Sequence, residues 1–290
     1  MSDPPTPDTA EATAHRLAGE LFPWDLTRAL ELALLKTFCV PSISGLLART
    51  GEFERRPRKR YDDTGLMVAE LLRHGPASPE GAAVIERMNR IHGHYAISND
   101  DFLYVLSTFV AEPIRWLARY GWRPLTALEQ EHLFLFWHGV GERMGIAALP
   151  ASLEALLNLN ERVEREAFAP AATNRRIAEA TLAMLLADWP PPLRPALRRV
   201  LLGLLDPQTS EALGWSAAPG WLQALVLQGL RARSRAAALV AAGRRALGRP
   251  APARFYSQHP TPSYGAGFRL EQLGPPPLLE ALGETPSGDP

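Results

Sequence analysis

Helix signals dominate the sequence between about residue 15 and residue 248. Ser78 stands directly before Pro79, and this pair is typical of a helix start, with serine as the cap and proline in the first turn. Thr126 and Glu129 have the spacing of a capping box. No run of alternating apolar residues, which would indicate a half-buried strand, occurs in the chain. The sequence therefore predicts an all-α protein, with a single multi-helix domain over residues 15–248 that encloses an apolar pocket.

Both ends of the chain have the composition of tails. Residues 1–14 are acidic and rich in Pro and Thr, and residues 249–290 are rich in Pro and Gly, so we expect both to be disordered. Phe255 and Tyr256 are the one local feature there that would pack back onto the body. The N-terminal stretch lacks the pattern of a signal peptide, and no unbroken apolar run of 18 residues occurs. The sequence predicts no transmembrane segment and a cytoplasmic location.

Composition narrows the classes of function. The 31 Lys and Arg residues balance the 31 Asp and Glu residues, which argues against nucleic-acid binding by overall charge. The stretch Arg231–Arg235 is the only candidate for a basic helix that would read DNA. Cys39 is the single cysteine, so zinc or iron–sulfur sites made of cysteines are excluded. We expect Cys39 to be a small buried apolar residue, and a thiolate ligand of a haem is the alternative. The glycine-rich phosphate loops and the Gly-x-Ser-x-Gly elbow are absent.

His92 is the first candidate functional residue. At 100° per residue, Ile85, Met88, His92 and Tyr95 fall on one apolar stripe of a helix, whereas His94 points the other way. An imidazole on an apolar face needs a partner, and a neutral imidazole is a good ligand for iron. A core histidine bonded to a backbone carbonyl is the structural alternative.

Arg60 and Thr64 form a second candidate group. They are four residues apart, so a helix places them on one face, which Met67 and Leu71 continue as an apolar stripe. A guanidinium and a hydroxyl at the open end of an apolar groove suit a haem propionate and a polar ligand. The structural alternative is a surface arginine and a threonine at a helix start.

These stretches resemble the family of MpaB and the latex-clearing proteins, which are rubber oxygenases. The similarity covers roughly residues 20–240 and depends on the order and spacing of four stretches: Arg60–Thr64, Arg87–His92, Ile97–Phe109 and Trp122–Ile146. The resemblance implies an all-helical protein that holds one haem b. It also implies that His92 is the axial ligand of the iron, and that Arg60 and Thr64 line the haem site as cofactor-binding and catalytic residues. Met88 lies on the same stripe as His92, so we expect it to contact the cofactor.

One position departs from the family pattern. Latex-clearing proteins have a lysine directly before the threonine, where this chain has Asp63. Capping of the iron by a lysine at this position is therefore ruled out, and rubber itself is not the expected substrate. We expect Asp63 near the rim of the same site, either as a proton acceptor in catalysis or as a solvent-facing carboxylate.

The resemblance implies a haem-dependent oxygenase. A haem with one protein ligand leaves an iron position open to dioxygen, and the second substrate would be an apolar small molecule, isoprenoid or otherwise unsaturated. Cleavage of a carbon–carbon double bond, hydroxylation and peroxidase-like chemistry all remain open. Two other functions also remain open. One is a non-catalytic haem- or ligand-binding protein, and the other is a di-iron oxidase with ligands at Glu129 and His132, although the chain holds no second Glu-x-x-His pair.

Overall fold

The helix boundaries follow the capping signals of the sequence. Ser78 and Ser98 each accept a hydrogen bond from a backbone N–H of the first turn, at 2.9 and 3.0 Å. Thr126 and Glu129 form the expected capping box, in which each side chain bonds the backbone of the other residue. These caps satisfy N–H groups that have no partner inside the helix, so they fix where three of the central helices begin.

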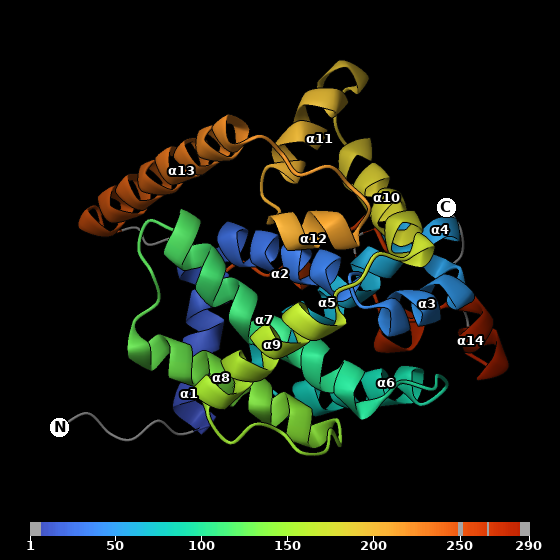
Figure 1. Cartoon of the computed structure of the whole chain (residues 1–290). Helices are drawn as coiled ribbons and strands as arrows, with labels where there is room; N and C mark the ends of the chain where they lie inside the picture. The colour runs from blue at the N-terminus through green and yellow to red at the C-terminus, as the bar shows by residue number, and fades with distance from the viewer. Residues whose placement is uncertain (1–6, 249–251, 266, 285–290) are drawn as a thin grey trace.

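The computed structural model describes residues 7–248, 252–265 and 267–284, and it is helical throughout (Figure 1). In chain order the helices are α1 (Pro7–Arg16), α2 (Pro23–Thr37), α3 (Pro41–Thr50), α4 (Glu52–Arg55), α5 (Pro57–His74), α6 (Pro79–His92), α7 (Asn99–Tyr120), α8 (Ala127–Arg143), α9 (Leu153–Ala167), α10 (Ala172–Ala187), α11 (Arg194–Leu202), α12 (Pro207–Ala212), α13 (Gly220–Ala246) and α14 (Pro276–Ala281). Four short turns are η1 (Leu17–Leu21), η2 (Pro191–Leu193), η3 (Tyr256–Gln258) and η4 (Leu270–Gln272). Within the described ranges the only β pairing is an isolated bridge, so the predicted all-α fold is confirmed.

Two large apolar cores and a smaller cluster around Tyr104 hold the helices together. The main core takes the buried faces of α1, α2 and α5–α8, and includes Leu71, Phe134 and Phe136. Within it α1 packs against α8, α2 against α7, and α5 against α6. A second core lies between the end of α2, α10 and α12, and contains Cys39. Helix α13 lies beside α7 and extends away from the body (Figure 1).

The N-terminal stretch differs from the tail expected for residues 1–14. Helix α1 begins at Pro7 and packs against α8, with Ala10 and Ala14 fully buried. The two alanines are four residues apart, so they share a helix face, and their small side chains allow close approach to α8. The acidic, Pro- and Thr-rich composition concealed this short apolar face; residues 1–6 lie outside the described part of the chain.

The C-terminal stretch also differs from the tail expected for residues 249–290. Residues 252–265 and 267–284 lie against the body, where Phe255 is 5% exposed and packs in the main core, as its apolar character predicted. Residues 249–251, 266 and 285–290 of this expected tail lie outside the described residues. Among the described residues no single helix is long and apolar enough to cross a membrane. Helices α2 and α3, which meet at an angle of 95°, have that length and composition only when taken together.

Candidate functional site

The candidate site lies at one end of the α5–α6 pair. The two helices are joined by a short loop and pack against each other, so the end of α6 returns to the start of α5. His92 is the last residue of α6, and Arg60 lies in the first turn of α5. The positive charge of Arg60 acts on the imidazole of His92 and on the phenol of Tyr95, which follows α6. The fold therefore brings together the candidate residues of two separate sequence stretches.

His92 has the properties of an unsatisfied neutral imidazole. Its Nδ1 atom is buried and has no hydrogen-bond partner among the described residues, so the bond expected of a structural core histidine is missing there. The ring lies edge-on to Phe102, with 5.5 Å between ring centroids. Burial, and to a smaller extent the charge of Arg60, lowers the pKa of His92 to about 4. The ring is therefore uncharged at neutral pH, which is the state that binds metals.

Arg60 and Thr64 contact each other directly. The Arg60 guanidinium donates to the Thr64 hydroxyl at 2.7 Å, and its Cζ lies 5.5 Å from the ring centroid of Phe53. Burial lowers the pKa of Arg60, and the charge of Asp63 opposes that effect. No carboxylate of the described ranges forms an ion pair with Arg60. A half-buried guanidinium without a carboxylate partner is suited to bind an anionic group.

The apolar residues expected around the ligands lie mostly in the core. Met67, Leu71 and Ile85 are 7%, 0% and 3% exposed and belong to the main core. Met88 is half-buried, packs against the same core, and stands one helical turn before His92. Of the predicted apolar residues, Met88 is thus the one that remains partly accessible beside the candidate ligand.

The structure corrects the expected position of Asp63. Its side chain is 2% exposed, and both carboxylate oxygens are occupied: Lys59 binds them at 3.0 and 3.1 Å, Tyr264 donates to one, and the Gly274 N–H donates to the other at 3.1 Å. Burial raises the pKa of the Asp63 carboxyl, and the charge of Lys59 opposes this. Asp63 is therefore neither solvent-facing nor free to accept a proton in catalysis; it anchors the C-terminal segment.

The position of Asp63 follows from the helix period. At 100° per residue Asp63 lies about 60° from Arg60, on the side away from Thr64. That side of α5 faces the C-terminal segment. The preceding Asp62 also faces it, since its carboxylate accepts from the Tyr256 hydroxyl at 2.8 Å.

Two cations, the buried Arg87 and the partly buried Lys59, hold the C-terminal segment across α5 and α6, and sequence reasoning missed them. Arg87 donates to the carbonyl oxygens of Glu271 and Leu273 at 2.7–2.9 Å. Lys59 donates to the carbonyl oxygens of the residues on either side of Leu273, at 2.9 and 3.2 Å. Arg87 also pairs with the Glu284 carboxylate at 2.6 Å. The two adjacent aspartates, Asp62 and Asp63, were the available signal for this contact.

The other candidate ligands have structural partners. The Glu129 carboxylate is used in the α8 cap and binds Arg123 at 2.6 Å. His132 shares a hydrogen bond with Thr13 through its Nδ1 atom at 2.7 Å, while its Nε2 atom is buried without a hydrogen-bond partner among the described residues. Cys39 is fully buried in the second core, where burial raises the pKa of its thiol well above the usual range. These groups are therefore engaged in the fold, and Cys39 belongs to a different core from His92.

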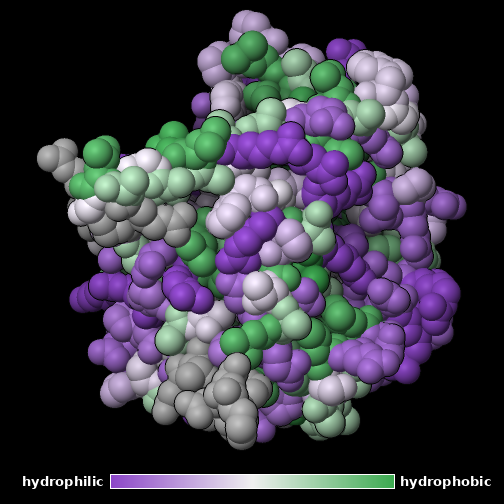
Figure 2. Space-filling view, turned by 90° about the vertical axis from the view of Figure 1, so that its left-hand side faces the viewer, coloured by the Kyte–Doolittle hydropathy of each residue, from purple (hydrophilic) through white to green (hydrophobic). Residues whose placement is uncertain are grey.

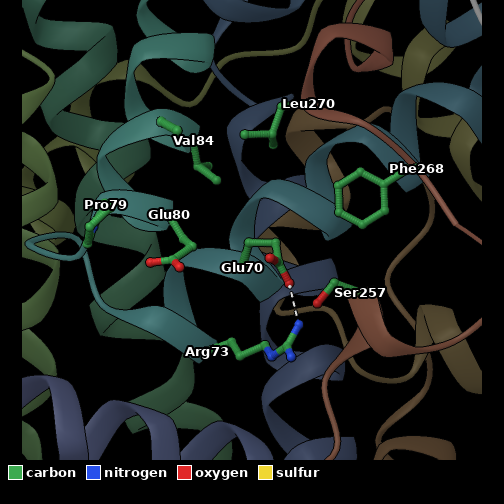
Figure 3. A pocket seen from close by; sticks show the side chains of 9 residues that line it. Glu70, Arg73, Pro79, Glu80, Val84, Ser257, Phe268 and Leu270 are labelled. Atoms are coloured by element: carbon green, nitrogen blue, oxygen red, sulfur yellow. Dashed lines mark hydrogen bonds and ion pairs between the residues drawn. The ribbon is translucent and has the colours of Figure 1, made fainter.

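A cavity of about 490 Å³ lies at the opposite end of the α5–α6 pair from His92 (Figure 3). Glu70 and Arg73 of α5 line it together with Phe268 of the C-terminal segment, and Figure 3 shows the Glu70–Arg73 hydrogen bond on its wall. Arg60 and Arg73 are separated by about 20 Å along α5, at 1.5 Å per residue. This cavity, and a second of about 430 Å³ between α7 and α9, are lined by other residues than His92.

Comparison with known proteins places the chain in a family. The family model described as "ER-bound oxygenase mpaB/B'/Rubber oxygenase, catalytic domain" matches residues 26–239, which include Arg60, Thr64 and His92. The chain belongs to this oxygenase family. The resemblance seen in the sequence is thus confirmed, and the matched region contains the whole α5–α6 pair.

Three fungal members of the family are similar to this chain. The ER-bound oxygenase mpaB of Penicillium roqueforti is 29% identical over 66% of this chain and 70% of its own length. The mpaB' and mpaB proteins of Penicillium brevicompactum are 29% and 28% identical, over 69% and 67% of this chain and 52% and 57% of their own lengths. All three names describe ER-bound proteins, which contradicts the cytoplasmic location expected from the sequence.

Proposed function

We propose that this protein is a haem b-dependent oxygenase that acts on an apolar small molecule, with His92 as the protein ligand of the haem iron. The observation that carries the proposal is the buried Nδ1 atom of His92, which has no hydrogen-bond partner among the described residues. A buried polar group without a partner is unfavourable, and binding of the imidazole to a metal offsets this. The residues at this end of α5 and α6 therefore fit the group that the family resemblance implies.

Arg60 and Thr64 supply the polar part of the proposed site. The guanidinium of Arg60 is half-buried, and it would bind a propionate carboxylate of the haem through a charge-assisted hydrogen bond. Thr64 fixes the orientation of that guanidinium through the 2.7 Å hydrogen bond between the two side chains. Met88 would contribute apolar contact one turn from His92.

The chemistry is divided between the cofactor and the chain. A bound haem supplies the redox chemistry with dioxygen. The chain keeps His92 uncharged, because burial and the charge of Arg60 disfavour its protonation, so its lone pair is free at neutral pH. Met88, which is half-buried one turn from His92, would provide apolar contact at the site, while Met67 and Leu71 are buried in the main core farther along α5.

The substrate class we propose is an unsaturated apolar molecule, such as an isoprenoid. The family description includes rubber oxygenases, and the relatives are named oxygenases. The reaction is either cleavage of a carbon–carbon double bond by dioxygen, which gives two carbonyl groups, or hydroxylation, which also consumes two electrons from an external reductant and releases water.

Isotope labelling tests the reaction. The reduced haem-containing protein would be incubated with ¹⁸O-labelled dioxygen and a panel of isoprenoids, and the products analysed by mass spectrometry. One labelled oxygen in each of two carbonyl products supports double-bond cleavage, whereas a single labelled hydroxyl supports hydroxylation. If the protein binds haem through His92 but consumes no dioxygen with any member of the panel, the oxygenase assignment fails and a non-catalytic haem-binding role takes its place.

A further inference from the structure

Helix α13 has an apolar stripe on its exposed side. Trp221, Leu225 and Leu239 are 69%, 62% and 75% exposed. At 100° per residue these three side chains, with the exposed Ala232 and Ala236 between them, lie within about 60° of one another. The stripe spans about 27 Å, at 1.5 Å per residue. A solvent-facing helix side normally carries polar residues, so this stripe needs a partner that the described chain does not provide.

The opposite side of α13 is the one that packs on the protein. Val226 is 6% exposed and Ser234 is fully buried, and both lie across the helix from the exposed stripe. The Arg231 guanidinium donates to the Arg119 carbonyl of α7 at 2.9 Å, and Arg233 pairs with Asp25 at 3.0 Å. These contacts fix the orientation of the helix, so the apolar stripe cannot turn inward without breaking them.

The charge around the stripe has one sign. No aspartate or glutamate occurs between Glu211 and Glu271, and α13 itself carries five arginines. Arg235 is exposed and lies on the helix about 40° from the edge of the stripe. An arginine beside an apolar face can extend its charged group toward a polar boundary while its methylene groups cover apolar surface.

We infer that the exposed face of α13 docks on an anionic lipid surface, with Trp221, Leu225 and Leu239 at the boundary between headgroups and acyl chains. An apolar stripe flanked by arginine, with an exposed tryptophan near one end, matches the pattern of helices that lie in a membrane interface. Negatively charged headgroups complement the arginines. A second copy of the chain fits less well, because like charges on the two helices would repel and neither helix carries a carboxylate to offset them.

Figure 2 shows the side of the molecule that carries the projecting end of α13, with apolar side chains gathered along its upper left. Residues 239–244 and Ala246 are exposed, so the C-terminal end of α13 lies clear of the body. The helix can therefore approach a flat surface without obstruction by the helices of the main core.

Vesicle flotation of the full-length protein, used as purified, tests the inference. Vesicles would consist of phosphatidylcholine alone or of equal parts phosphatidylcholine and phosphatidylglycerol. We expect binding to the mixed vesicles that weakens as salt is raised, and little binding to the neutral ones. The double substitution Leu225→Glu with Leu239→Glu should weaken binding to mixed vesicles at least about tenfold. Leu128→Glu, on α8 and 48% exposed, is the matched control and should bind as the wild type does.

Two further readouts separate the lipid surface from other partners. Brominated lipids should quench tryptophan fluorescence in the wild type, and Trp221→Phe should remove most of the lipid-dependent quenching. The inference is overturned if wild-type protein stays unbound with mixed vesicles, or if the double variant binds as tightly as the wild type. A wild-type dimer that the double substitution converts to monomer, without vesicle binding, would assign the stripe to a second copy instead. None of these readouts depends on haem chemistry, so they remain informative if the proposed oxygenase function fails.

Discussion

Replacement of Arg87 by methionine tests whether the buried hydrogen bonds of Arg87 hold the C-terminal segment on the body of the protein. Arg87 is 6% exposed, and its guanidinium bonds two carbonyl oxygens of the segment and the carboxylate of Glu284. Methionine has a similar length but no donors, so the substitution removes these bonds and leaves the carbonyl of the fully buried Leu273 without this partner. A hydrogen bond from a charged donor contributes about 1.5–3 kcal/mol, and a buried unsatisfied carbonyl costs a similar amount.

We therefore expect Arg87→Met to lower the free energy of unfolding by about 3 kcal/mol. Arg90→Met is the matched control, because Arg90 pairs with the same Glu284 carboxylate at 2.9 Å but has a side chain that is 49% exposed. An exposed ion pair of this kind contributes less than about 1 kcal/mol. Both variants would be compared by urea denaturation followed by circular dichroism.

Hydrogen–deuterium exchange would localise the effect. In Arg87→Met the amides of residues 267–284 should exchange faster than in the wild type, because the segment opens locally more often. Equal losses of stability in the Arg87 and Arg90 variants, with unchanged exchange in this segment, would show that buried hydrogen bonds to Arg87 do not hold the C-terminal segment.

Three other substitutions test local features of the fold. The hydrogen bond from Arg198 holds the pKa of the Glu179 carboxyl below 4.5, so the ionised carboxylate should stabilise the fold above pH 4.5 and lose this effect as the pH falls below it. Across this pH range the melting temperature of Glu179→Gln should therefore fall less than that of the wild type, as measured by thermal unfolding. A side chain at Gly81 would collide with the carbonyl oxygen of Gly75, so Gly81→Ala should destabilise by several kcal/mol, about the size of a severe packing defect. Gly229→Ala in α13 meets no atom within 4 Å and should stabilise by about 0.5–1 kcal/mol. A Gly81→Ala variant that melts at the wild-type temperature, or a Gly229→Ala variant that melts below it, would contradict the corresponding expectation.

Local patterns in the sequence predicted the parts of the fold that depend on local physics. The caps at Ser78 and Thr126 form as expected, because a capping residue bonds an N–H group only two or three positions away. The helical stripe placed Met88 and His92 on one side of α6, one turn apart. Arg60 lies close enough to His92 for its charge to act on the imidazole. The family resemblance predicted this proximity, whereas the sequence periodicity could not, because no periodicity relates two separate helices.

Long-range contacts account for what the sequence did not predict. Asp63 is buried because Tyr264 and Gly274, about two hundred residues later in the chain, bond its carboxylate. The Pro- and Gly-rich composition of the C-terminal segment correctly disfavoured long helices, but it carried no information about the cations of α5 and α6 that bind its backbone carbonyls. Backbone acceptors of this kind leave no pattern in the side chains.

The haem content of two histidine variants decides whether His92 is the iron ligand. His92→Ala removes the proposed ligand, whereas His94→Ala removes a neighbouring, exposed imidazole that bonds the Arg90 carbonyl at 2.8 Å. Each variant would be purified after growth with excess haem precursor, and haem per chain and the Soret band recorded. We expect His94→Ala to match the wild type, while His92→Ala loses the haem or shows a shifted Soret band because its axial ligand has changed. Wild-type haem content and an unchanged Soret band in His92→Ala would contradict the assignment of His92 as the ligand.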